Sequence, residues 1–142
     1  MIRNATKLAM VAAAGVLMLA VGGAADARPR LTGEEQLAKL LEGRVAGEPV
    51  NCISMPNVQS SRVIDKTAIV YGSGSTIYVQ RPRSGAETLD SDDILVTQLT
   101  TSQLCSIDTV QLRDRNGYFW RGFVGLDKFV PYTKPAKVAL AD

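Results

Sequence analysis

Three short stretches of this 142-residue chain carry side chains whose types and spacing could do chemistry, and the first of them is acidic. The run Asp90-Ser91-Asp92-Asp93 offers closely spaced carboxylates, the oxygen ligands that a hard cation such as Ca²⁺ prefers. It lacks the turn glycine and the closing glutamate of an EF-hand loop. Acidic residues before an apolar stretch are also typical of a solvated loop or a helix start. We therefore expect a solvated loop here and no metal site.

The second stretch is basic and reads Arg81-Pro82-Arg83-Ser84-Gly85. Two guanidinium groups on an extended, proline-stiffened loop could bind a carboxylate or a phosphate through their forked donors. The same loop could present a basic side chain to a trypsin-like protease, as an inhibitor loop does. The simpler interpretation is a surface loop whose arginines pair with Glu87 and Asp90. We keep Arg81 and Arg83 as possible ligand contacts.

The third stretch is aromatic: Tyr118-Phe119-Trp120 stands next to Arg121 and could form a platform for a sugar or a peptide. Alternate residues of a strand face opposite sides, so we expect Phe119 and one neighbour in the core. Trp120 or Tyr118 would then face outward, and single exposed aromatic side chains are ordinary. Trp120 is kept as a third possible ligand contact.

The sequence contains no histidine, which excludes many catalytic mechanisms. There is no Ser-His or Cys-His nucleophile pair and no imidazole metal ligand. The remaining catalytic option is a carboxylate pair formed by Asp92 or Asp93 with Asp108. A formal net charge of +2 and 6% aromatic residues give little support for nucleic-acid binding. We expect no catalytic residues, no cofactor and no nucleic-acid partner.

The first 27 residues have the organisation of a secretory signal peptide. Arg3 and Lys7 form a positive start, residues 8–21 are uncharged, and Ala25-Asp26-Ala27 offers a small-x-small cleavage site. An uncleaved anchor is the alternative, although the uncharged stretch 8–25 only just reaches spanning length. We predict cleavage after Ala27, a mature chain without a membrane span, and a periplasmic or secreted location.

Cys52 and Cys105 are the only cysteines, and an even count in a small exported chain predicts a disulfide. The bridge would close a loop of 105 − 52 = 53 residues. Such a closure restricts the unfolded chain by about 4 kcal/mol in the loop-entropy picture. Two buried free thiols are the alternative.

A short helix is predicted within the N-terminal segment 28–49, over residues 31–44. Thr32 can cap its start, with Glu35 three residues later completing a capping box, and Gly43 can end it. One apolar stripe follows helical spacing and consists of Leu37, Leu40 and Leu41. We expect this helix to cover a sheet.

The rest of the chain, a domain over residues 50–132, reads as short strands joined by turns. The clearest hairpin is TAIVY-GSGS-TIYVQ, whose Gly72–Ser75 turn lacks the lysine and the following helix of a phosphate-binding loop. Residues 81–93 are predicted as a long loop, Asn116-Gly117 as a tight turn, and 133–142 as a flexible tail. Strands are expected at 50–55, 62–64, 67–71, 76–80, 108–114 and 118–124. Residues 94–99 are expected to form a seventh strand or a short helix, and residues 129–130 a last short extended piece.

These signals predict a mainly β fold: a small antiparallel β-barrel or sandwich of about six to seven short strands with one N-terminal helix. Closure of the strands would hide the edges that a small exported protein must otherwise protect.

The order of five motifs in this domain resembles a domain-of-unknown-function family of small exported proteobacterial proteins. The motifs are Asn51-Cys52-Ile53, Ser61–Asp65, Ile77-Tyr78-Val79, Leu104–Asp108 and Phe129–Tyr132, and together they span most of residues 50–132. Many relatives carry a second cysteine pair, where this chain has Gly85-Ala86 and Phe123-Val124. The resemblance implies export and a β architecture, and it brings no activity, substrate or catalytic residue.

The function we expect is therefore that of an exported, disulfide-stabilised β domain that binds an unknown protein or an envelope component without catalysing a reaction. The alternative is an inhibitor of an extracytoplasmic hydrolase that acts through the loop Arg81–Gly85.

Overall fold

The structure is a computed structural model that describes residues 28–137. The predicted signal peptide (1–27) and the end of the predicted tail (138–142) lie outside the described residues. Within the described part of the chain, no helix combines the length and the apolar character needed to cross a membrane.

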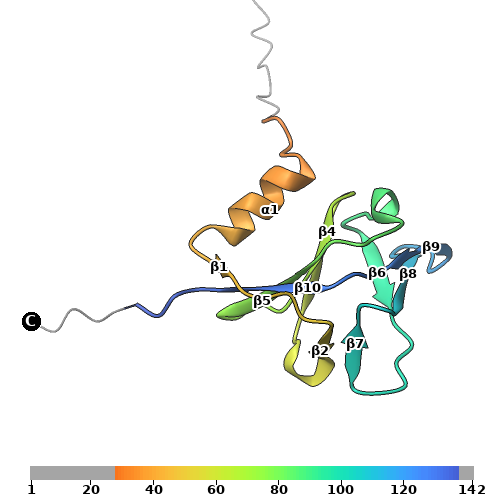
Figure 1. Ribbon diagram of the computed structural model, residues 1–142. Helices are drawn as coiled ribbons and strands as arrows, with labels where there is room; N and C mark the ends of the chain where they lie inside the picture. Colours follow the sequence, from red (N-terminus) through yellow and green to blue (C-terminus); the bar gives the residue numbers. More distant parts are fainter. Residues whose placement is uncertain (1–27, 138–142) are drawn as a thin grey trace, which may run out of the picture.

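The described chain is mainly antiparallel β-structure with one N-terminal helix, as the sequence predicts (Figure 1). It has ten short strands, not six or seven, and none of its three sheets closes on itself within residues 28–137. The elements are α1 (Gly33–Leu41), β1 (Val45–Ala46), β2 (Cys52–Ser54), η1 (Met55–Asn57), β3 (Ser61–Ile64), β4 (Ala68–Tyr71), β5 (Thr76–Gln80), η2 (Ala86–Thr88), β6 (Asp93–Val96), β7 (Gln103–Cys105), β8 (Thr109–Asp114), β9 (Trp120–Gly125) and β10 (Phe129–Thr133).

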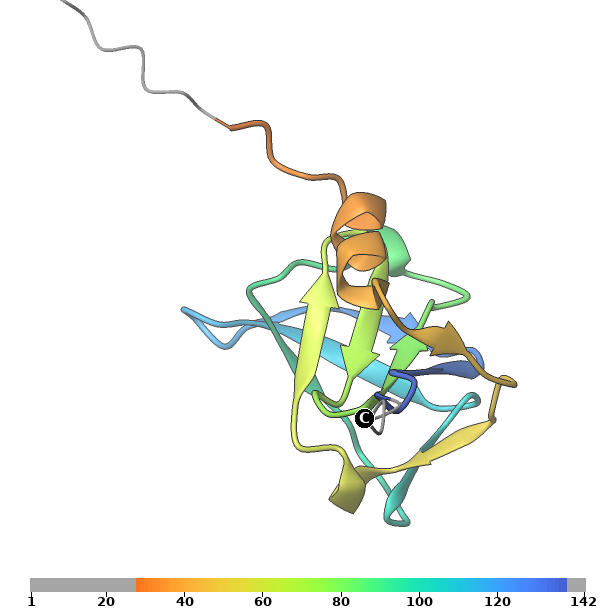
Figure 2. The same cartoon turned by 90° about the vertical axis from the view of Figure 1, so that its left-hand side faces the viewer.

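The strands form a five-stranded sheet in the order β1-β10-β5-β4-β3, a two-stranded sheet β2-β7 and a three-stranded sheet β6-β8-β9. Helix α1 covers one face of the five-stranded sheet, and the two smaller sheets lie on its other face (Figures 1 and 2). The molecule therefore has three layers, with the large sheet in the middle.

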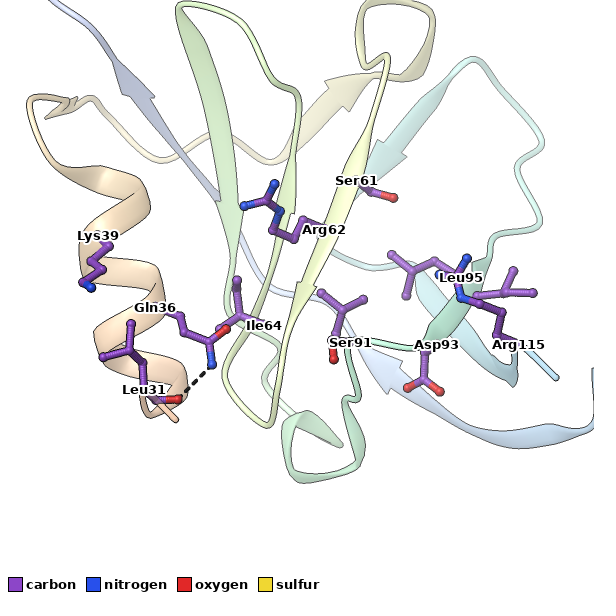
Figure 3. Close-up of a pocket in the computed structure, with 12 residues that line it drawn as sticks. Leu31, Gln36, Lys39, Ser61, Arg62, Ile64, Ser91, Asp93, Leu95 and Arg115 are labelled. Atoms are coloured by element: carbon purple, nitrogen blue, oxygen red, sulfur yellow. Dashed lines mark hydrogen bonds between the residues drawn. The ribbon is translucent and has the colours of Figure 1, made fainter. Parts of the chain in front are cut away.

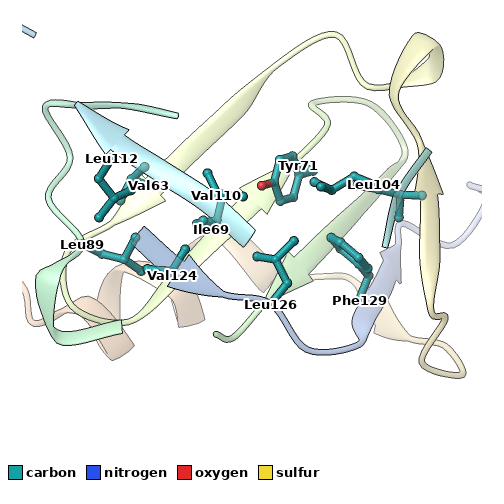
Figure 4. Packing of buried hydrophobic residues seen from close by; sticks show 11 residues of the cluster. Val63, Ile69, Tyr71, Leu89, Leu104, Val110, Leu112, Val124, Leu126 and Phe129 are labelled. Atoms are coloured by element: carbon teal, nitrogen blue, oxygen red, sulfur yellow. The ribbon is translucent and has the colours of Figure 1, made fainter. Parts of the chain in front are cut away.

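The alternation of residues along β4 explains this layering, because all four of its residues are buried. Ala68 and Val70 pack toward Leu37 of α1, whereas Ile69 and Tyr71 pack toward the smaller sheets. The hydrophobic core thus consists of two clusters, one between α1 and the large sheet and a larger one between the large sheet and the smaller sheets. The larger cluster contains residues of all three sheets and an edge-to-face pair of Tyr71 and Phe129 (Figure 4).

The predicted helix lies within its expected range and begins with the predicted capping box. The Glu35 backbone N–H donates to Thr32 Oγ1 at 3.3 Å, and the Thr32 N–H donates to Glu35 Oε2 at 2.7 Å. Arg44, just beyond the helix, donates to the carbonyl oxygens of Gly74 and Ser75 at 3.1 and 2.8 Å. These bonds attach the end of α1 to the β4–β5 turn. This turn lies at Gly72–Ser75, where the sequence predicts a hairpin turn.

Several predicted boundaries of strands and turns are wrong, because contacts with other parts of the chain set these boundaries. Residues 94–99 were predicted as a strand or a short helix; the strand is confirmed, but β6 covers only Asp93–Val96, the residues that pair with β8. The Asn116-Gly117 pair lies inside a five-residue loop and does not form a two-residue turn, since Asp114 Oδ1 accepts hydrogen bonds from both backbone N–H groups. Strand β10 continues through Pro131 to Thr133, which the prediction assigned to the tail.

The predicted disulfide is confirmed. Cys52 and Cys105 lie directly opposite each other in the β2–β7 ladder, with their Cα atoms 4.0 Å apart. The bridge holds together two three-residue strands that are 53 positions apart in sequence.

Candidate functional site

A groove lies between the five-stranded sheet and the three-stranded sheet, and it is the candidate site. Its walls are β3, the edge strand of the first sheet, and β6, the edge strand of the second. Helix α1 and the β8–β9 loop complete it with Lys39 and Arg115 (Figure 3). The cavity has a volume of about 730 Å³, which is large enough for several amino-acid residues.

The backbone of β3 presents unpaired groups to this groove. The Gly72 N–H donates to the Ser60 carbonyl at 2.7 Å, which makes Ser60 a hydrogen-bonded position of the β3–β4 ladder. Because such positions alternate in an antiparallel pair, Arg62 and Ile64 also face β4. The backbone groups of Ser61 and Val63 consequently point away from β4 and into the groove.

The backbone of β6 does the same from the opposite wall. Asp114 exchanges hydrogen bonds with the β8–β9 loop, so its neighbour Arg113 faces β6. Ile94, the partner of Arg113, therefore faces β8, and the backbone of Leu95 points into the groove. Two open strand edges thus face each other across one cavity.

A smaller cavity of about 200 Å³ extends the groove and shares Ser61 and Leu95 with it. Tyr71 lines this extension, and its buried hydroxyl has no hydrogen-bond partner among the described residues. Burial of the ring raises the pKa of the Tyr71 hydroxyl, so the phenol stays neutral far above physiological pH.

Positive charge dominates the walls of the groove. Lys39 and Arg62 line the side next to α1, and Arg115 lines the side next to β6. The carboxylate of Asp93 also lines the cavity, but its side chain is fully buried and forms an ion pair with Arg121. Its second oxygen accepts the Asp90 N–H at 3.0 Å. The three lining cations are therefore not neutralised by Asp93.

A β-bulge in β9 positions Arg121 for this ion pair. Trp120 pairs with Arg113 and Gly122 pairs with Leu112, so Arg121 is the extra residue between them. The bulge also places Trp120 and Phe123 on the same outer face of the sheet, opposite Arg113 and Gln111. A regular strand would separate these two aromatic side chains.

The prediction for the aromatic stretch is only partly confirmed. One of Trp120 and Tyr118 was expected to face outward, and both are exposed. Phe119 was expected in the core with the other neighbour, but it is 64% exposed. Phe119 lies in the loop before β9, where strand alternation does not apply, and Tyr118 has a positive φ of 56°. None of these side chains lines the groove.

The two candidate arginines also lie outside the groove, and their surroundings differ. Arg81 forms a two-pronged ion pair with Glu34 of α1 at 2.7 and 2.9 Å, not with Glu87 or Asp90. This pairing lowers the pKa of Glu34 and raises that of Arg81. Arg83 is exposed, and its backbone N–H donates to the carbonyl of Gly125 at 3.0 Å.

The acidic run forms local backbone contacts. Asp90 Oδ1 accepts the Asp92 N–H at 2.9 Å, and Asp65 Oδ1 accepts the Ser91 N–H at 2.6 Å. In residues 28–137, no group of three or more carboxylate or cysteine side chains is placed to hold a metal ion.

The carboxylate pair considered above is separated by the length of β8. Asp93 pairs with Asp114 at one end of this strand, and Asp108 directly precedes its other end. Six residues of β-strand span about 20 Å, which exceeds the carboxylate separations of glycosidases. The Asp108 carboxylate instead accepts the Cys105 N–H at 2.7 Å.

Comparison of the chain with protein-family models, with curated proteins and with solved structures gives no match. The groove was not foreseen from the sequence, because its walls come from strands about 30 positions apart that do not pair with each other.

Proposed function

We propose that this protein is an exported binding domain, not an enzyme, and that the groove between β3 and β6 is its ligand site. The signal-peptide pattern of residues 1–27 supports export, and the disulfide suits an oxidising compartment. The lack of histidine and the separation of Asp93 from Asp108 support a non-enzymatic role.

The observation that carries the proposal is the pair of open strand edges within one large cavity. Proteins normally protect sheet edges, because unpaired N–H and C=O groups invite pairing with another chain. Here the backbone of Ser61 and Val63 faces that of Leu95 across the cavity. A ligand in the cavity that pairs with these backbone groups would protect both edges. A protein or an envelope component is the partner class we propose.

The proposal is tested by capture from an envelope extract with the mature protein (residues 28–142) as bait. Wild type is compared with the double variant Arg62→Glu/Arg115→Glu, which reverses two charges of the groove. The matched control is Lys128→Glu/Lys134→Glu, which reverses two exposed charges outside it. We expect a component that the groove variant loses and the control keeps; capture that is identical for all three baits would refute the groove as the ligand site.

Inhibition of an extracytoplasmic hydrolase is the second candidate, and one observation favours it. The backbone around Arg83 is fixed by hydrogen bonds from Arg83 N–H to Gly125 O and from Gly125 N–H to Ser84 O, at 3.0 and 3.1 Å. Arg83 is thus an exposed basic side chain on an anchored loop, as inhibitors of trypsin-like proteases require. Loss of inhibition in Arg83→Ala, with inhibition retained in Arg81→Ala, is expected if this candidate is correct.

A further inference from the structure

We infer that the groove binds one extended, acidic peptide segment, which adds as a strand between β3 and β6. This inference rests on the proposed function and names the chemistry of the occupant. It is carried by three observations: the relative direction of the two walls, their unpaired backbone groups, and the sign of the charges around them.

The two walls run in opposite directions along the groove. At one end the chain after η2 contacts the β3–β4 turn, where the Lys66 N–H donates to the Leu89 carbonyl at 3.0 Å and the Ser91 N–H donates to Asp65. At the other end, Ser61 and Leu95 line the shared extension of the cavity. A strand added between the walls would be antiparallel to one of them and parallel to the other.

The unpaired backbone groups match the requirements of an added strand. Ser61 and Val63 on one side, and Leu95 on the other, each offer one N–H donor and one carbonyl acceptor. Peptides that extend a sheet in this way gain affinity from main-chain hydrogen bonds, and pockets for alternate side chains give specificity. The four residues of β6 set a span of about 13 Å, so the paired part of the occupant is about four to six residues long.

The charges select the composition of the segment. Lys39, Arg62 and Arg115 line the groove, whereas the lining carboxylate of Asp93 is already paired with Arg121. Lys66, in the β3–β4 turn that contacts Leu89, is a further exposed cation next to the groove. Acidic side chains on the solvent side of the added strand would meet these cations, and apolar side chains on its other side would meet Val63 and Leu95.

The test uses the mature protein and a capped heptapeptide in which glutamate and valine alternate. Two matched peptides serve as controls: one has lysine in place of glutamate, and the other keeps the acidic sequence but carries N-methyl groups on its backbone amides. Fluorescence anisotropy should show binding of the acidic peptide at least about tenfold tighter than that of either control. The Arg62→Glu/Arg115→Glu variant should weaken binding by about tenfold, and Lys128→Glu/Lys134→Glu should leave it within about twofold.

Amide hydrogen exchange of the complex provides the second readout. The amides of Ser61, Val63 and Leu95 should become protected when the acidic peptide binds, because each would then donate to the added strand. Binding without this protection, or equal binding of the N-methylated peptide, would overturn strand addition. Equal or tighter binding of the lysine peptide, or no binding of any peptide, would overturn the acidic occupant.

These outcomes differ from failure of the proposed function. A groove that binds the lysine peptide, or a partner captured from the extract in a groove-dependent manner, would leave the ligand site in place and refute only its acidic chemistry. Sedimentation of the peptide-free protein identifies one further outcome: a dimer abolished by Arg62→Glu/Arg115→Glu would make a second copy the occupant and overturn the inference.

Discussion

At the scale of single residues, two buried polar side chains differ in how well they are paired. Gln80 is fully buried, and its amide both donates to the Asp127 carbonyl and accepts the Asp127 N–H, the latter at 3.0 Å. Tyr71 is equally buried, but its hydroxyl has no partner in the described residues and borders the extension of the groove. A buried polar group without a partner reduces stability, so the two side chains should respond differently to substitution.

The variant Tyr71→Phe tests this difference. We expect its free energy of unfolding in urea to match or exceed that of wild type by up to about 1 kcal/mol, because the change removes an unpaired hydroxyl and keeps the ring. Burial raises the pKa of Tyr71, so its contribution to stability is present below the pKa of the unfolded chain, about 10, and is lost as the pH rises above that value. The variant should therefore lose less stability than wild type between about pH 9 and pH 11.

A loss of more than about 1 kcal/mol in Tyr71→Phe at neutral pH would contradict this account, since it would mean that the hydroxyl is paired in solution. Tyr71→Leu serves as the control for packing and should be destabilised by the loss of the edge-to-face contact with Phe129.

At the scale of elements, the sequence predicted those helices and strands that have local signals and missed those that exist only through tertiary contacts. The helix start was predictable because Thr32 and Glu35 satisfy each other's backbone groups locally, and β4 and β5 were predictable from their β-branched residues and the Gly72–Ser75 turn. The strands β1 and β7 were missed because they are two and three residues long and exist only through their partners β10 and β2.

Some features of the candidate site were likewise predictable from the sequence, whereas others depend on tertiary contacts. The disulfide was predictable from composition, and strand alternation correctly predicted an outward-facing aromatic side chain at Trp120 or Tyr118. The ion pair of Arg81 with Glu34 could not be predicted, because it joins a loop to a helix 47 positions away. The groove itself depends on which edges the three sheets leave open, and hydrophobic periodicity carries no such information.

The capping box of α1 yields a prediction with a defined pH dependence. Hydrogen bonds with the Thr32 backbone and side chain lower the pKa of Glu35. The stabilisation by the capping box is therefore present above the pKa that Glu35 has in the unfolded chain, and it is lost as the pH falls through the lowered pKa of the folded chain. Thr32→Ala should reduce the free energy of unfolding by about 1 kcal/mol at neutral pH.

Urea unfolding at pH 7 and pH 3 provides the measurement, with Glu42→Gln as the control at an exposed carboxylate near the other end of the helix. Glu35→Gln should narrow the stability difference between the two pH values, and Glu42→Gln should leave it nearly unchanged. An unchanged pH dependence in Glu35→Gln would contradict the assigned cap.

At the scale of the whole molecule, the large sheet is the layer that connects everything else. Helix α1 is packed against one of its faces, and the two smaller sheets share a core with the other face. The disulfide secures the smallest sheet, whose strands have only three residues each. The groove lies where the large sheet and the three-stranded sheet end next to each other without pairing.

Removal of the disulfide should lower the stability of the whole domain. The double variant Cys52→Ala/Cys105→Ala should lose about 4 kcal/mol, since the bridge closes a loop of 53 residues in the unfolded chain. Urea unfolding of this variant against wild type measures the loss, and an intact mass two daltons below the reduced value verifies the bridge in wild type. A loss under about 1 kcal/mol would show that β2 and β7 hold together without it.

The open edges of β3 and β6 are the central claim, and amide hydrogen exchange of the free protein tests them most directly. Backbone groups alternate between facing the paired strand and facing away from it in the two ladders. This alternation predicts fast exchange of the amides of Ser61, Val63 and Leu95, which face the groove. It predicts slow exchange at the intervening amides of Arg62, Ile64, Ile94 and Val96, which face β4 or β8. Slow exchange at all seven amides would mean that the two edges already pair in solution, and the groove would then have no open strand to offer.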